Sequence, residues 1–115
     1  MVLSADGDHL VIRTEDGHEY EARDVLLTQG ISMTLAKESG IDTVPGTEPR
    51  IQTIIAVGAD GQTNKPGVWA AGTAAGVSVH TIVTAGDGAR VAINIISRQR
   101  GERHVDHDVL ASPTP

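Results

Sequence analysis

Two kinds of residue in this sequence could do chemistry: glycines that follow apolar runs, and a tail rich in histidine and aspartate. Thirteen glycines are many for 115 residues, so some of them must allow close approach of the backbone to other backbone or to a ligand. The tail residues His104, Asp106, His107 and Asp108 are of metal-ligand types. Without a visible scaffold, a solvated polar run is the favoured interpretation of this tail, and a metal site is the weaker one.

Composition excludes several function classes. The chain has no cysteine, which rules out disulfides, cysteine-bound zinc, thiol nucleophiles and a dithiol redox pair. Nine Lys and Arg against 15 Asp and Glu give a net charge of −6, which argues against a bare nucleic-acid binder and against docking on an anionic membrane. No signal peptide and no apolar run of ~20 residues is visible, so we expect a soluble, cytoplasmic protein. Because aromatic residues make up only 2%, its core must be aliphatic.

The first third of the sequence predicts a three-stranded antiparallel β-meander. Residues 10–14 are apolar and β-branched, and Asp16-Gly17 is a strong hairpin signal. Residues 18–22 alternate as the returning strand. Residues 25–28 form a short continuous apolar run, which suits a strand covered on both faces, as in a parallel or mixed sheet.

The middle of the chain predicts shorter elements. Ser32 is expected to cap a short helix over 33–38, and residues 43–50, with two prolines and a glycine, are expected to form a loop. Two further short strands are expected, over 51–57 and 68–71. Trp69, in the second of them, is expected in the core.

A long helix is predicted over about 79–97. Apolar residues recur there at spacings of three and four and make one helical face. They are Ile82, Ala85, Ala89, Ala92, Ile93 and Ile96. Gly86 and Gly88 each cost ~1 kcal/mol relative to alanine in an exposed helix interior, so we expect them to permit close packing against a strand or a cofactor. Asp87 between them is interpreted as a solvated or capping carboxylate rather than a cofactor contact, and Gly101 as the helix stop.

Three segments, in this order and spacing, resemble the C-terminal part of a thioredoxin-reductase-like flavoprotein, a member of the FAD-dependent pyridine nucleotide-disulfide oxidoreductases. They are the meander up to Gly30, the segment DGQTNKPGVWAAGT over 60–73, and the helix start HTIVTAGDGAR over 80–90. The likeness is greatest to small members that have only the FAD domain. It implies an α/β fold: a partial FAD/NAD(P)-binding, Rossmann-like domain over residues 1–101, followed by a polar tail over 102–115.

The resemblance also implies a cofactor site. In that family the strand end lies against the flavin, and the N-terminal amides of the following helix face the C2 carbonyl region of the ring. Carried over, the FAD-binding residues are Gly72, Thr73, His80, Thr81 and Ile82. Thr73 stands where the family has an aspartate, so its hydroxyl replaces one hydrogen bond but not the charge. Contact of His80 with a flavin edge and exposure of His80 to solvent are equally open.

The sequence departs from the family in one large respect: the G-x-G-x-x-G fingerprint that binds ADP is absent, and so is Cys-x-x-Cys. The resemblance therefore implies an NAD(P)H-linked oxidoreductase that is active only with an ADP-binding half. The chain would then be a fragment, a truncated reading frame or one chain of a split flavoprotein. The alternative is a non-enzymatic α/β module that self-associates, or pairs with another chain, through exposed apolar faces. A homo-oligomer is expected.

Overall fold

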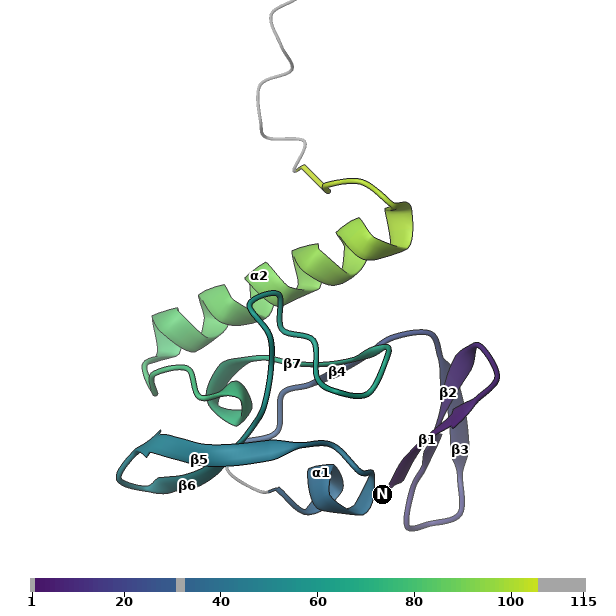
Figure 1. Ribbon diagram of the computed structural model, residues 1–115, viewed down its shortest axis with the longest axis horizontal. Helices are drawn as coiled ribbons and strands as arrows, with labels where there is room; N and C mark the ends of the chain where they lie inside the picture. Colours follow the sequence, from purple (N-terminus) through teal and green to yellow (C-terminus); the bar gives the residue numbers. More distant parts are fainter. Residues whose placement is uncertain (1, 31–32, 106–115) are drawn as a thin grey trace, which may run out of the picture.

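The computed structural model describes residues 2–30 and 33–105, a mixture of short strands and a long C-terminal helix (Figure 1). In this part of the chain the strands form three small sheets. The expected α/β class is thereby confirmed at the level of its elements. Among the described helices, none has both the length and the apolar character needed to cross a membrane.

The β-meander lies one strand earlier in the chain than predicted. Strands β1 (Val2–Asp6), β2 (His9–Arg13) and β3 (Glu19–Ala22) pair antiparallel in this order. The first turn contains Gly7, whose φ of 66° suits the tight connection. The strand β4 (Val25–Leu27), predicted as the third strand of the meander, is not part of it.

Strand β4 instead pairs in parallel with β7 (Val68–Ala70), 40 residues later in the chain. Val25 lies opposite Val68, and Leu27 opposite Ala70. All three residues of β7 are buried. The apolar run over 25–28 indicated a strand of a parallel or mixed sheet, but the antiparallel pairing predicted for it in the meander is wrong.

The loop predicted over 43–50 is wrong. Strand β5 (Thr43–Glu48) occupies most of that range and pairs antiparallel with β6 (Ile51–Ile55). The register shifts between Pro45 and Glu48, and such an irregularity at an edge strand is where a proline can be accommodated. Before this hairpin, α1 (Thr34–Glu38) follows Met33, while the predicted cap Ser32 lies outside the described residues.

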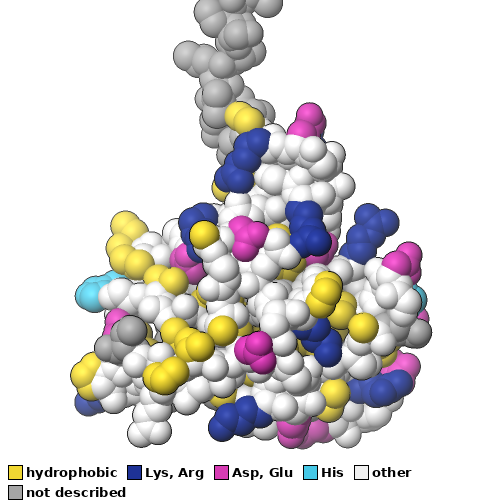
Figure 2. All heavy atoms as spheres, in the orientation of Figure 1, with side chains coloured by type: hydrophobic (Ala, Val, Ile, Leu, Met, Phe, Trp, Pro, Cys, Tyr) yellow, Lys and Arg dark blue, Asp and Glu magenta, His cyan; other side chains and the backbone are white. Residues whose placement is uncertain are grey.

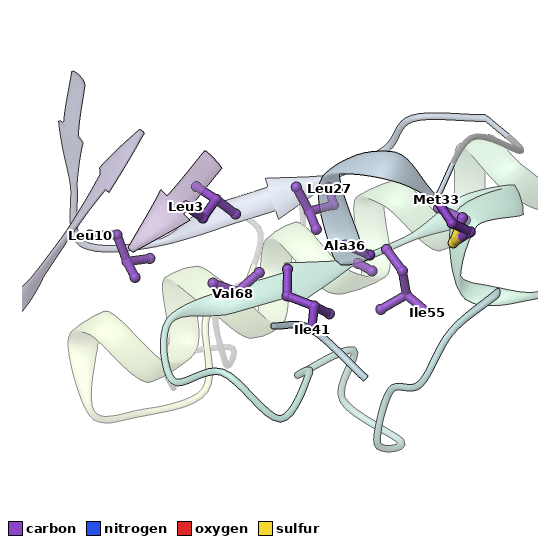
Figure 3. Packing of buried hydrophobic residues seen from close by; sticks show 10 residues of the cluster. Leu3, Leu10, Leu27, Met33, Ala36, Ile41, Ile55 and Val68 are labelled. Carbon is purple, nitrogen blue, oxygen red and sulfur yellow. The ribbon is translucent and has the colours of Figure 1, made fainter. Parts of the chain in front are cut away.

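The core is aliphatic, as predicted, and consists of two clusters. The larger one joins β1, β2, β4, α1, β6 and β7 (Figure 3). Its labelled members are Leu3, Leu10, Leu27, Met33, Ala36, Ile41, Ile55 and Val68. The smaller one contains Trp69, Ala71 and Val91, and it attaches the long helix. Trp69 is 1% exposed, which confirms its predicted place in the core.

The long helix α2 (Thr81–Arg100) lies over β4 and β7 (Figure 1) and ends at Gly101, as predicted. The helix packs against the rest of the domain with the face opposite to the apolar face predicted from the sequence. Val91 is fully buried, whereas Ile82 is 84% exposed. The packed face is held by hydrogen bonds to the turn over 58–62: Arg90 Nη1 donates to Ala59 O at 2.6 Å, and Asn94 Nδ2 donates to Asp60 O at 3.0 Å.

Close packing of the two helix glycines against a strand, one of the two expected reasons for them, is not found. A Cβ added at Gly86 or at Gly88 would meet no described atom within 4 Å. The tight approach to α2 occurs instead at Gly61, in the turn that faces it. There an added Cβ would lie 2.8 and 2.9 Å from the two methyl carbons of Val91.

A substitution at Gly61 therefore tests the close packing of α2 against the turn over 58–62. Its φ is 94°, so Gly61→Ala adds backbone strain to the clash with Val91. We expect it to lower the free energy of unfolding by about 2–4 kcal/mol in urea denaturation. Gly17→Ala is the matched control, because the φ of Gly17 is 87° but a Cβ added there meets no described atom within 4 Å. The free energy of unfolding of this variant should fall by only about 1–2 kcal/mol. Equal losses in both variants would contradict this packing.

The same turn predicts an acid dependence of stability. The backbone N–H of Gln62 and then its side-chain amide donate to the Asp60 carboxylate at 3.0 and 2.6 Å, and they hold the pKa of that carboxyl below its ordinary value. A lowered pKa stabilises the fold above the unfolded value of about 3.9 and ceases to do so as the pH falls through the folded value. Asp60→Asn should therefore be less stable than wild type at neutral pH, and this difference should shrink below about pH 4. A difference in urea midpoint that is constant with pH would refute the prediction.

Candidate functional site

A pocket of about 330 Å³ lies where β4 and β7 end and α2 begins. We call it the strand-end pocket. Its size is at the lower end of the ~300–1,000 Å³ range of small-molecule sites. Its walls come from the end of β4, the end of β7 and the first two turns of α2. They consist of Thr28, Gly30, Ala71, Gly72, Thr73, Thr81, Thr84, Ala85 and Gly88.

The parallel pairing of β4 with β7 creates this position. Carboxyl ends of parallel strands meet at one edge of the sheet, and ligands of such sheets bind in the crevice outside that edge. The pairing continues one step beyond β7, where Ala71 N donates to Leu27 O at 3.1 Å. At Gly72 the φ of 73° turns the chain away from the sheet into the short 3-10 helix η1 (Gly72–Ala75). The backbone of Gly72 is consequently at the pocket wall.

Asp87 joins the strand end to the helix. Its Oδ2 accepts a hydrogen bond from Gly72 N at 2.8 Å, and its Oδ1 lies 3.1 Å from Arg90 Nε and 3.0 Å from Arg90 Nη2. The Asp87 side chain is only 10% exposed. The predicted solvated carboxylate is therefore wrong, whereas the capping alternative agrees with the acceptance of the Gly72 N–H, the first of η1, which fixes the backbone of the pocket.

The beginning of α2 presents backbone donors. His80 precedes the helix in an extended conformation, and its carbonyl accepts from Val83 N and Thr84 N. In the described structure, the side chain of His80 makes no capping hydrogen bond to α2, and no acidic residue lies in the first turn of this helix. The first N–H groups of an α-helix have no partner within the helix, so the positive end of the helix dipole remains available there.

The structure brings together part of the predicted set. Gly72, Thr73 and Thr81 line the strand-end pocket, together with Thr28 and Gly30, which follow β4. His80 and Ile82 are not among the lining residues. The His80 side chain is exposed, with Nδ1 at 2.9 Å from Ser78 Oγ. The Ile82 side chain points to solvent, so only its backbone N–H belongs to this helix start.

Sequence reasoning did not assign Thr84 or Ala85 to the site, and it named Gly88 only as a glycine that permits close packing against a strand or a cofactor. The spacing of these three residues from Thr81 follows one face of an α-helix, so a signal was present in the sequence. The apolar periodicity, to which Ala85 was assigned, obscured this signal.

The strand-end pocket can bind but offers little chemistry of its own. Its described lining residues are glycine, alanine and threonine, and none of these titrates near neutral pH. One hydroxyl is already engaged, since Thr84 Oγ1 donates toward the carbonyls of His80 and Thr81 at 3.2 and 3.1 Å. The pocket therefore offers backbone groups and hydroxyls to a ligand, and any reactive group must be brought by that ligand.

A larger pocket of about 500 Å³ lies between the meander and the C-terminal part of α2. Its polar side chains mostly serve the fold. Asp24 accepts from Trp69 Nε1 at 2.9 Å and from Gln99 Nε2 at 2.8 Å, and Lys65 Nζ donates to Ser39 O at 3.0 Å. The guanidinium of Arg98 lies 5.9 Å from the centre of the Trp69 ring, a cation–π contact. This pocket is the weaker candidate.

The metal alternative gains no support from the described part of the chain, where no three His, Asp or Glu side chains are placed to hold an ion. Of the tail residues, His104 Nδ1 lies 2.9 Å from Arg100 Nη1. Asp106, His107 and Asp108 lie outside the described residues.

Removing the carboxylate of Asp87 tests its role at the pocket wall. We expect Asp87→Ala to cost about 1–3 kcal/mol of unfolding free energy, because the N–H of Gly72 loses its acceptor. We also expect the Gly72 amide to exchange with solvent at least about tenfold faster. Asp87→Asn retains one oxygen acceptor and should lose less in both measurements. Unchanged exchange at Gly72 in the alanine variant would show that this hydrogen bond is not what holds the strand end.

Known proteins do not assign this site. Comparison of the sequence with protein-family models finds no match, and comparison with curated proteins finds none. The functional conclusion therefore rests on the resemblance carried by residues 60–73 and 80–90 and on the geometry of the strand-end pocket.

Proposed function

We propose that this chain contributes the flavin-proximal part of an FAD-dependent, NAD(P)H-linked oxidoreductase related to thioredoxin reductase. One observation carries the proposal: the strand-end pocket unites Gly72 and Thr73, at the end of a parallel strand, with the first turn of α2. This is the arrangement that the resemblance implies for the wall of a flavin site.

The residues of the pocket fit a flavin ring. Small side chains and glycine backbone leave flat surfaces, as a tricyclic ring requires. At about 330 Å³, the pocket has room for a ring system and not for a whole dinucleotide. The remainder of FAD would be bound by an ADP-binding unit from outside these 115 residues.

Each of these residues then has a defined role in the proposed flavin site. The backbone of Gly72 allows close approach, and the hydroxyl of Thr73 donates or accepts one hydrogen bond. The first N–H groups of α2, at Thr81 and Ile82, place the positive end of the helix dipole where negative charge must be stabilised. Bound flavin supplies the hydride and electron transfer. Because the chain has no cysteine, a dithiol relay must come from outside these 115 residues.

The parallel β4–β7 pair supports the finer assignment of a Rossmann-like sheet. In the proposed assembly, strands of the ADP-binding unit extend this pair into a larger parallel sheet. The non-enzymatic alternative, a self-associating α/β module, is favoured by one separate observation: α2 exposes apolar side chains, of which Ile82 is 84% exposed.

Two glycines on α2 allow a matched test of flavin binding. Gly88 lines the strand-end pocket and Gly86 does not, and at either position an added Cβ meets no described atom within 4 Å. Replacing either glycine by leucine raises helix propensity, so both variants should fold. We expect Gly88→Leu to weaken flavin uptake at least about tenfold, and Gly86→Leu to leave it near the wild-type value.

Uptake is measured by the shift of the flavin absorption band and the quenching of its fluorescence. FAD is titrated into the chain with and without a polypeptide carrying the G-x-G-x-x-G unit of a thioredoxin-reductase-like FAD domain, and lumiflavin serves as the probe without ADP. Failure to take up any of these flavins under all conditions would overturn the proposal, and equal effects of the two leucine variants would remove the flavin from this pocket.

A further inference from the structure

The larger pocket, of about 500 Å³, lies at the edge of the β4–β7 pair where both strands begin. We call it the strand-start pocket. Its walls are the residues before β4, the turn before β7, the first turn of the meander and the end of α2. Figure 2 shows Lys and Arg side chains on the right of the view, where the end of α2 and the meander meet. The strand-start and strand-end pockets share no described lining residue, so they are separate sites.

Three cationic side chains line the strand-start pocket: Arg23, Lys65 and Arg98. In the described part of the chain, none of the three forms an ion pair with a carboxylate, whereas three other arginines do. The chain has 15 Asp and Glu against nine Lys and Arg, so acidic partners are not scarce. Three unpaired cations around one cavity are therefore a feature of this pocket and not of the chain as a whole.

Two of these cations are held in place by neutral groups. Lys65 Nζ donates to Ser39 O at 3.0 Å. The guanidinium of Arg98 donates to Gln62 Oε1 and lies 5.9 Å from the centre of the Trp69 ring. A carbonyl, an amide and an aromatic face orient a cation but leave its charge uncompensated.

The backbone that carries Arg23 is fixed to the turn that carries Lys65. Val25 N donates to Gly67 O at 2.9 Å, and a Cβ added at Gly67 would lie 2.7 Å from Arg23 O. Gly67 has a φ of 80°, which allows this close approach. The two segments are thus in place before any ligand arrives, which lowers the entropic cost of binding.

Two carboxylates also line the pocket, and neither pairs with these cations. Both oxygens of Asp24 are engaged, by Trp69 Nε1 at 2.9 Å and by Gln99 Nε2 at 2.8 Å. Asp8 lies 3.3 Å from His9 Nδ1, and its side chain is fully exposed. Three cations against two carboxylates leave the lining with a net positive charge.

We propose that the strand-start pocket binds a phosphate monoester of a small organic molecule. A phosphate group carries close to two negative charges at neutral pH and three terminal oxygens, so each of the three cations has an oxygen to bind. A carboxylate has one charge and two oxygens and satisfies only part of this set. Ala5, Leu10 and Pro66 add an apolar part to the wall, against which the organic body packs. This inference does not rest on the flavin proposal.

Titration of the full chain with three probes tests the ligand class. Phenyl phosphate has the phosphate and a ring, benzoate replaces the phosphate by a carboxylate, and inorganic phosphate lacks the ring. We expect phenyl phosphate to bind at least about fivefold more tightly than either of the others, as measured by calorimetry. In amide NMR spectra it should shift the signals of Arg23 and Gly67 and not that of Gly72. No binding of phenyl phosphate at about 10 mM, or equal binding of all three probes, would overturn the proposal.

Substitutions locate the phosphate. Arg23→Gln and Lys65→Gln should each weaken phenyl phosphate binding about tenfold, because each removes one charge-assisted hydrogen bond. The Arg23 side chain makes no hydrogen bond in the described structure, so its variant should fold, which circular dichroism checks. Arg50→Gln removes the same charge from an exposed position between β5 and β6 and is the matched control, with binding as in wild type.

The beginning of α2 also attracts anions, and one further variant separates the two places. Gly88→Leu, which narrows the strand-end pocket, should leave phenyl phosphate binding unchanged. Loss of binding in this variant, or wild-type affinity in folded Arg23→Gln, would place the phosphate elsewhere and refute the assignment.

Discussion

The Asp87 carboxylate receives the Gly72 N–H on one oxygen and the Arg90 guanidinium on the other. This single group links the end of β7 to the middle of α2 and sets the distance between them. Charge-assisted hydrogen bonds to a sheltered carboxylate are among the stronger polar contacts in proteins. The strand-end pocket exists because this link holds the helix start over the strand ends without filling the space between them.

Further hydrogen bonds beside that of Asp87 explain which face of α2 packs against the domain. Arg90, Asn94 and Arg98 all bond to the turn over 58–62, and Gly61 leaves room there for Val91. Those hydrogen bonds, buried Val91 and partly buried Ile95 hold one face of the helix against its own domain. The opposite face lies at the surface, where Ile82 is 84% exposed.

Local patterns indicated some elements and misled on others. The β-branched run at 10–14, the Asp16-Gly17 turn and the helix ending at Gly101 were predicted from the sequence, because turn and helix-end preferences act over a few residues. The β5–β6 hairpin was missed because its prolines and glycine have the composition of a loop, whereas the pairing with Ile51–Ile55 comes from a neighbouring segment. Of the site, Gly72, Thr73 and Thr81 could be named from the family likeness and Gly88 from its cost in a helix interior, but Thr84 could not be named.

By itself the sequence determined the aliphatic core, the presence of a short strand after residue 24, the long helix and the glycine at its end. These follow from composition and from hydrophobic periodicity, which are properties of neighbouring residues. Only the tertiary structure decided which strand β4 joins, which face of α2 is buried and what Asp87 binds. Those outcomes depend on contacts between segments 15 to 43 residues apart, whose geometry no local pattern specifies.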